Sequence, residues 1–255
     1  MTDGAIAAYA DNLIAMLLVS LRIGPTLAFA PPFTLIKIPL FVRVFLGVAL
    51  SAALVGAYPQ AHSSDLLDQS LVAAAASELL LGISLAIALQ LAFAAILTAG
   101  RAIDFQVGFG LSLIADPTLR TQMPLIGTLF AYAAGAVFFA TNGPNDLVAI
   151  WTQSLRDIPV GAFAVSGDLS TLLTYISTVF VLALGLGGIA VVTLFICDLA
   201  IAFMSRTLPQ MNVLLLGFQV KTIALLMTLP FAFSFSGALF LRIVRLAIDT
   251  TPRLG

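Results

Sequence analysis

Long runs without a single charged side chain are the feature that most constrains this chain. Five such runs, at 44–64, 79–100, 121–145, 169–197 and 222–241, contain no Asp, Glu, Lys or Arg. Each is close to the roughly 20 residues that a helix needs to cross a ~30 Å hydrocarbon core. Soluble domains carry charges on about a quarter of their residues, whereas only 9% of these 255 residues are charged and 61% are hydrophobic. The chain is therefore predicted to be an integral membrane protein.

A weaker apolar run that contains Arg22 brings the number of candidate segments to about six. A backbone in lipid must satisfy its own hydrogen bonds, and the runs lack the residue alternation of a membrane β-barrel. The predicted fold class is therefore all-α, a polytopic membrane protein. Its expected helical segments are 12–30, 39–57, 71–99, 124–141, 170–203 and 213–241.

The composition limits which catalytic or metal sites and which partners the chain can have. The net charge is −1 and no basic block exists, which argues against a nucleic-acid partner. Cys197 and His62 are the only residues of their types, which excludes an intrachain disulfide and a two-histidine metal site. The HExxH motif is absent, and GFGLSL lacks the aspartate of the GxGD proteases. We therefore expect no enzymatic activity, no metal and no cofactor.

The charges near the span ends and at the N-terminus say little about how the chain is placed in the membrane. Five Lys and Arg residues lie near the span ends on one side and four on the other, so the positive-inside rule leaves the orientation open. The N-terminal stretch MTDGAIAAYA carries acidic residues rather than a basic region, so no signal peptide is expected.

Two connecting stretches are expected to be more than spacers. After the third segment, apolar residues alternate with polar or small ones, and Gly108 and Gly110 weaken any helix, so 108–123 is predicted to be irregular and closed by Asp116-Pro117 and Pro124. After the fourth segment, Asn145 or Asp146 is expected to cap a short helix over 147–157. Its buried face would carry four apolar side chains, Leu147, Trp151, Leu155 and Ile158.

Three charged residues fall within or at the edges of the apolar segments: Glu78, Asp198 and Lys221. Each costs roughly 2.5–3.5 kcal/mol near a bilayer centre, so each requires compensation. They could form an ion or proton relay, or they could be paired charges that fix how helices dock. Lys221 could also lie near enough to a span end to reach water without a partner.

The stretch Pro209-Gln210-Met211-Asn212 interrupts the last two apolar segments. Pro209 should end the preceding helix, and the amides of Gln210 and Asn212 can bond to exposed helix ends. A turn between two helices is expected there.

An ordered set of motifs runs through nearly the whole chain. The motifs are RIGPTLAFAPPF with IPLFVRVFLGVAL at 22–50, Glu78 with GISLAIAL, GRAIDFQVGFG with ADP at 100–117, NGPNDLVAIWTQSLRDIPVG at 142–161 and PQMNVLLLGFQVK at 209–221. Together they resemble the FliR family of flagellar export-gate subunits, which is similar to the SctT subunits of virulence-type secretion systems. Gln219 stands where the family usually has proline, and Pro144-Asn145 replace a more basic or apolar pair.

The resemblance implies a single membrane domain over 1–255, with about 1–165 similar to FliP and about 166–255 similar to FliQ. It implies one copy in a ring of FliP-like and FliQ-like subunits, with a FlhB-like subunit nearby, in the inner membrane at the flagellar basal body. Unfolded flagellar proteins would pass through this channel. Membrane lipid is the remaining expected partner.

The resemblance also implies two groups of site residues. The family places an apolar loop across the closed channel, which corresponds here to a plug at Gly108, Phe109, Gly110, Leu111, Leu113, Ile114, Asp116 and Pro117. Polar contacts between subunits are expected at Arg43, Glu78, Asp198, Pro209, Gln210, Asn212 and Lys221.

Three other functions remain as alternatives to a flagellar export subunit. They are an SctT-type virulence subunit, a solute transporter with a midplane site, and a membrane enzyme.

Overall fold

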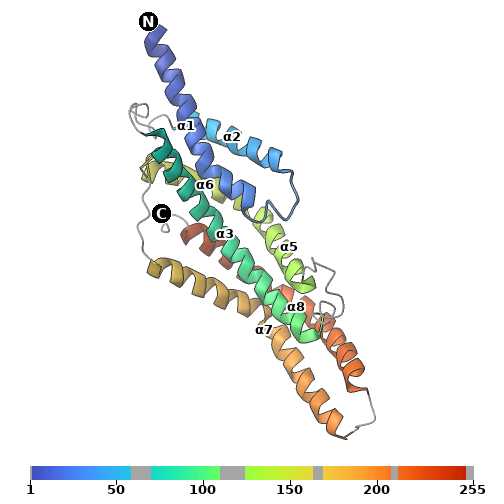
Figure 1. Ribbon diagram of the computed structural model, residues 1–255. Helices are drawn as coiled ribbons and strands as arrows, with labels where there is room; N and C mark the ends of the chain where they lie inside the picture. Colours follow the sequence, from blue (N-terminus) through green and yellow to red (C-terminus); the bar gives the residue numbers. More distant parts are fainter. Residues whose placement is uncertain (1, 59–69, 110–123, 163–168, 208–211, 251–255) are drawn as a thin grey trace. The chain divides into compact units, whose positions relative to one another are not determined.

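A computed structural model describes residues 2–58, 70–109, 124–162, 169–207 and 212–250 of the chain (Figure 1). Within these ranges the regular structure is helical, with no strand. The helices are α1 (Thr2–Phe29), α2 (Leu40–Ala57), α3 (Leu71–Val107), α5 (Leu125–Ala140), α6 (Gly143–Asp157), α7 (Leu169–Thr207) and α8 (Val213–Thr250).

The predicted all-α membrane fold is confirmed. In the described part of the chain, five helices are long and apolar enough to cross a membrane: α1, α2, α3, α7 and α8. A sixth span arises if α5 and α6, which bend by 71° at their break, are one crossing. The 16 residues of α5 alone give about 24 Å of helix, less than the ~30 Å hydrocarbon core.

Helix α3 continues past the predicted end at 99 and stops at Val107. The charges that follow residue 100 suggested an earlier end, but a buried stripe of helical spacing, Ile96, Ala99, Ile103 and Val107, runs on. The helix does end where the sequence predicts the irregular stretch to begin. Gly108 has a φ of 102°, a left-handed conformation that glycine adopts readily and that ends the helix.

Helix α6 begins four residues before the predicted start at 147. Neither Asn145 nor Asp146 is its cap, because both lie inside the first turn; Asn142 holds the N-cap position in a left-handed conformation with φ 63°. The predicted buried face is confirmed for Leu147, Trp151 and Leu155. Its opposite face is exposed and polar, and carries Asn145, Asp146, Gln153, Arg156 and Asp157.

The chain divides into two compact units. Unit 1 comprises Met1–Leu91, Phe138–Tyr175 and Val244–Gly255; unit 2 comprises Ala92–Val137 and Ile176–Ile243. Helices α3, α5, α7 and α8 contribute to both. The likeness of 1–165 to FliP and of 166–255 to FliQ is a separate matter and stays a prediction.

Each unit has its own apolar core. In unit 1, α2 packs on α1, and the ring of Phe33 meets those of Phe138 and Phe139 edge-to-face. In unit 2, Phe130 of α5 packs edge-to-face with Phe233 and Phe240 of α8, at centroid distances of 5.3 and 6.1 Å. Such aromatic pairs contribute about 0.5–1.5 kcal/mol each beyond the area they bury.

Candidate functional site

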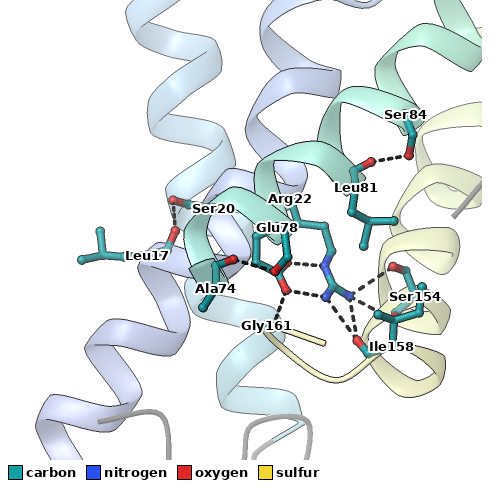
Figure 2. Close-up of polar contacts among 11 residues, drawn as sticks. Leu17, Ser20, Arg22, Ala74, Glu78, Leu81, Ser84, Ser154, Ile158 and Gly161 are labelled. Carbon is teal, nitrogen blue, oxygen red and sulfur yellow. Dashed lines mark hydrogen bonds and ion pairs between the residues drawn. The ribbon is translucent and has the colours of Figure 1, made fainter. Parts of the chain in front are cut away.

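Arg22 of α1 and Glu78 of α3 form a completely buried ion pair in unit 1 (Figure 2). Arg22 Nε donates to Glu78 Oε2 at 2.6 Å, and Nη2 donates to Oε1 at 2.8 Å. Both side chains are 0% exposed. Two parallel N–H···O bonds are the strongest arrangement that a guanidinium and a carboxylate can make, and each charge lowers the cost of burying the other.

The remaining donors of Arg22 hold the end of α6. Nη1 donates to the Ser154 carbonyl at 2.9 Å and to the Ser154 hydroxyl at 3.1 Å, while both Nη atoms reach the Ile158 carbonyl at 3.1–3.2 Å. Gly161 N–H donates to Glu78 Oε1 at 2.8 Å. A cation at a helix C-terminus satisfies carbonyls that lack helical partners and is favoured by the helix dipole. We call these five residues the Arg22 cluster; it docks α6 on α1 and α3.

Close backbone contact between α1 and α3 brings the two charges together. Pro25 lies inside α1 and cannot donate a hydrogen bond to the Leu21 carbonyl. Gly82, one turn beyond Glu78, lies against this carbonyl: a Cβ added there would be 2.5 Å from Leu21 O and 2.6 Å from Arg22 O. Only glycine therefore allows α3 to approach α1 this closely.

The last turn of α1 is capped by side chains from neighbouring helices. Arg43 of α2 donates through Nη1 to the Ala28 carbonyl, and Gln90 of α3 donates through Nε2 to the Phe29 carbonyl at 3.1 Å. These carbonyls have no partner further along the helix. Among the described residues, Nε of Arg43 has no hydrogen-bond partner.

Asp104 plays the corresponding role at the start of α5 in unit 2. Its two carboxylate oxygens each accept from Ile126 N–H at 3.1 Å, and Oδ2 also accepts from Gly127 N–H at 3.3 Å. The side chain is 6% exposed. Free N–H groups and the positive end of the helix dipole stabilise a buried anion. Asp104 therefore fastens α5 to α3, where Gly100 and Gly127 also meet backbone to backbone.

A second charged pair joins three helices in unit 2. Lys221 of α8 pairs with Asp198 of α7, and Asp198 Oδ2 accepts from Gln106 Nε2 of α3 at 2.6 Å. Lys221 Nζ also donates to the Gln106 carbonyl at 3.1 Å. The side chains of Lys221 and Asp198 are 19% and 35% exposed. We call Gln106, Asp198 and Lys221 the Lys221 cluster.

These features lie in a stretch of chain that matches a known family. Residues 13–247 match the family described as "Bacterial export proteins, family 1". The chain belongs to this family. The predicted family resemblance is thus confirmed, and the membrane-spanning helices agree with a role in protein export.

Individual proteins are similar to this chain along most of their length. "Flagellar biosynthetic protein FliR" of Bacillus subtilis (strain 168) is 30% identical over 216 residues, which cover 83% of each chain. The protein of the same name from Escherichia coli (strain K12) is 26% identical over 239 residues, 92% of this chain and 91% of the relative. "Secretion system apparatus protein SsaT" of Salmonella typhimurium is 25% identical over 173 residues, 66% of each chain.

Most of the plug residues implied by the family resemblance lie outside the described residues: Gly110, Leu111, Leu113, Ile114, Asp116 and Pro117. Gly108 and Phe109 are described and form the turn after α3. The Phe109 ring packs on the Phe218 ring of α8, with centroids 6.0 Å apart. The plug itself stays a prediction.

The expected turn before α8 is described only at its last residue, since Pro209 and Gln210 lie outside the described ranges. Asn212 accepts from Leu215 N–H through Oδ1 at 3.3 Å, which is the N-cap bond expected of an asparagine there. Asn212 is exposed, so it also remains free to meet another subunit.

The predicted polar contacts divide into two kinds. Glu78 has both oxygens bonded within the chain and is completely buried, so its charge is compensated without a neighbouring subunit. Asp198 and Lys221 compensate each other but reach the surface. Lys221 has a partner, so the alternative of an unpaired lysine reaching for water is wrong. Both ion pairs join helices. An ion or proton relay stays a prediction, as do contacts of Arg43, Asp198 and Lys221 with other subunits.

Sequence reasoning assigned no role to five of the residues used here: Arg22, Ser154 and Gly161 of the Arg22 cluster, Gln106 of the Lys221 cluster, and Asp104, which caps α5. A signal for the first existed, because Arg22 and Glu78 are opposite charges, each alone in its apolar segment. Asp104 and Gln106 lay in the stretch taken to follow the third helix. Ser154 contributes through its backbone carbonyl as well as its hydroxyl, and a residue's backbone role leaves no mark on its identity.

Proposed function

We propose that the chain is a non-enzymatic subunit of the flagellar type III export apparatus in the bacterial inner membrane, at the flagellar basal body. It would assemble with FliP-like and FliQ-like subunits, beside a FlhB-like subunit, into the channel through which unfolded flagellar proteins leave the cytoplasm. The observation that carries this proposal is the match to two FliR proteins over 83–92% of the chain.

The flagellar role is favoured over the virulence-type one by the extent of the matches. The FliR relatives cover more of the chain, at 26–30% identity, than SsaT does at 25% identity over 66%. "Yop proteins translocation protein T" of Yersinia pestis covers only 57%. An SctT-type subunit is therefore the second candidate.

Exposed apolar surface supports assembly with other membrane subunits. In α2, Phe41 and Phe45 are 73% and 75% exposed, and only 17% of this helix is buried within the chain. Arg43, on the same helix, has a donor that no described residue satisfies. Helices that meet in a membrane are held by close packing and by polar contacts, and this helix offers both.

A second proposed contact surface surrounds the Lys221 cluster. Asp198 is 35% exposed, and beside it on α7 lie Phe195, at 54% exposed, and Leu199, at 46% exposed. A charged pair in an apolar surface is costly against hydrocarbon. A polar group from a neighbouring subunit would remove that cost. We also propose subunit contacts for Pro209, Gln210 and Asn212, which lie between α7 and α8 in the sequence.

The segment 108–123 is proposed to seal the resting channel. A pore wide enough for an unfolded chain leaks ions unless an apolar constriction excludes water. Phe109, Leu111, Leu113 and Ile114 supply apolar surface, and Gly108 and Gly110 lower the barrier to moving it aside. Deleting 110–120 should raise ion leakage through the assembled complex in proteoliposomes while the yield of complex stays unchanged. Unchanged leakage at normal yield would place the seal in other subunits.

Co-expression tests the proposed function as a whole. The chain, carrying an affinity tag, is expressed alone and together with the FliP-like and FliQ-like proteins of the same organism, and is purified in detergent. Together they should yield one stable complex, and the chain alone should be degraded or aggregate. A monodisperse, protease-resistant monomer that transports a solute or turns over a substrate by itself would favour the transporter or enzyme alternatives.

A further inference from the structure

The C-terminal end of α3 is held from outside by a lysine of another helix. The Gln106 carbonyl lies in the last turn of α3, where carbonyls lack helical partners, and it accepts from Lys221 Nζ at 3.1 Å. Lys221 is itself held by its ion pair with Asp198. Asp198 in turn accepts from the Gln106 side chain at 2.6 Å. The three residues therefore close a ring of contacts at the helix end.

The turn that follows is seated on the same stretch of α8. Gly108 and Phe109 N–H both donate to the Asp104 carbonyl, at 3.2 and 3.0 Å. The Phe109 ring then packs edge-to-face on Phe218, about one helical turn before Lys221. One segment of α8 thus contacts both the last turn of α3 and the first residue that follows the glycine.

We propose that Lys221 is a positioning residue that fixes the end of α3, and with it the Gly108–Phe109 turn, on α8. Without the amine, the Gln106 carbonyl loses its donor and Asp198 loses its opposite charge. Helix ends without such partners open locally at a low free-energy cost. The Gly108 and Phe109 amides, whose acceptor lies in this last turn, would then be exposed to water more often.

The inference rests on the proposed function in one respect, which is that the turn leads into the proposed seal. Lys221 would then set where movement of the seal begins, because residues up to Phe109 are held on α8. The chain up to and including Phe109 should therefore stay in place when the channel opens.

Amide hydrogen exchange in the purified complex tests the positioning role directly. In Lys221→Met the amides of Gly108 and Phe109 should exchange about tenfold faster, because the last turn of α3 opens more often. Lys221→Arg keeps the charge and a donor and should restore slow exchange. Leu226→Met, on an exposed position of the same helix, is the matched control and should leave exchange unchanged.

A second variant and a distant set of amides show whether the opening is local or a general loss of folding. Asp198→Asn removes the charge pair but keeps the Lys221 amine near the Gln106 carbonyl, so it should raise the exchange rate less than Lys221→Met. Exchange at the α7 amides of the buried residues Ala183 and Leu186, far from the end of α3 along the chain, reports on unit 2 as a whole and should not change. Unchanged exchange in Lys221→Met, or equal exchange in the Met and Arg variants, would overturn the proposal.

Ion leakage through the same complexes separates the proposed seal at 108–123 from the proposed positioning role of Lys221. Lys221→Met should raise leakage in proteoliposomes, and Lys221→Arg should not. If deletion of 110–120 leaves leakage unchanged, the seal is wrong, but the exchange result still decides the role of Lys221. If the deletion leaks and Lys221→Met exchanges no faster than the unsubstituted chain, the seal stands and the positioning role is wrong.

Discussion

Two ion pairs in the described part of the chain compensate charges within apolar helices, and they do so in opposite ways. Arg22 and Glu78 are 0% exposed and bond to each other through two hydrogen bonds; Arg22 also bonds to the end of α6, and Glu78 also accepts from Gly161 N–H. Asp198 and Lys221 are 35% and 19% exposed and share one helix end. The first pair is complete inside unit 1, whereas the second is open to whatever surrounds unit 2.

This difference separates folding from assembly. A charge that is buried and fully bonded within a chain has nothing left to offer another subunit, so its loss should harm the fold. A partly exposed pair contributes little to the fold and has groups left for contact. The Arg22 cluster is therefore expected to determine stability, and the Lys221 cluster to determine interactions.

Removing one partner of the buried pair should have the largest effect. Arg22→Ala leaves the Glu78 carboxylate buried without a cation and should cost about 3–5 kcal/mol of stability. Thermal unfolding of the purified complex in detergent measures it. Ser20→Ala is the matched control, because the Ser20 hydroxyl bonds only within its own helix among the described contacts. A loss below about 1 kcal/mol would mean that water reaches Glu78.

A double variant sharpens this first prediction. Arg22→Met with Glu78→Met removes both charges and should destabilise by less than the two single variants added together, because each single variant leaves one unpaired buried charge and the double variant leaves none. Additive losses would show that the two side chains act independently, contrary to the 2.6 and 2.8 Å bonds between them.

The close approach of α1 and α3 should be the next most sensitive feature. Gly82→Ala places a Cβ against two backbone carbonyls and should cost about 1–3 kcal/mol, as overpacking does. Gly188→Ala in α7 is the control, because a Cβ there has nothing within 4 Å, and alanine favours a helix more than glycine does. Equal melting temperatures for the two variants would refute the tight contact.

Loss of the α5 cap should have a moderate effect. Asp104→Ala leaves the Ile126 and Gly127 amides without their acceptor and should cost about 0.5–2 kcal/mol. Asp104→Asn keeps one oxygen acceptor and should cost less. Hydrogen exchange at these two amides is the measurement, and equal exchange in both variants would show that water takes the place of the carboxylate.

The smallest effect on stability is expected at the exposed pair. Asp198→Asn should change the unfolding free energy by only about 0–1 kcal/mol, since solvent and neighbouring groups screen a partly exposed pair. The same variant should weaken assembly with partner subunits. A loss of stability as large as that of Arg22→Ala would erase the distinction between the two pairs.

Some features of the fold could be predicted from the sequence and others could not, because they depend on different physical causes. The membrane class and the helices were predictable, because lipid imposes long apolar runs and helical backbone. The end of α3 was not, since Asp104 and Gln106 look like polar loop residues until the helices that bond to them are known. The cap of α6 was misplaced because Asn142, which holds the N-cap position, makes no side-chain hydrogen bond of the kind used to predict a cap.

The ion-pair partners were unpredictable for a related reason. Glu78, Asp198 and Lys221 were recognised as costly charges from the apolar residues around them, but which charge meets which depends on how helices pack. Gly82 is an example: its lack of a side chain brings α3 against α1 at Arg22, and the sequence around it reads as any apolar helix.

The most direct test compares Glu78→Gln with Asp198→Asn in cells that also express the FliP-like and FliQ-like subunits. Two quantities are measured for each variant: the amount of chain in the membrane, and the fraction of that chain that co-purifies with the partners. Glu78→Gln should lower the amount and leave the fraction unchanged, whereas Asp198→Asn should leave the amount unchanged and lower the fraction. If both variants lower the same quantity, the assignment of one pair to folding and the other to assembly is wrong.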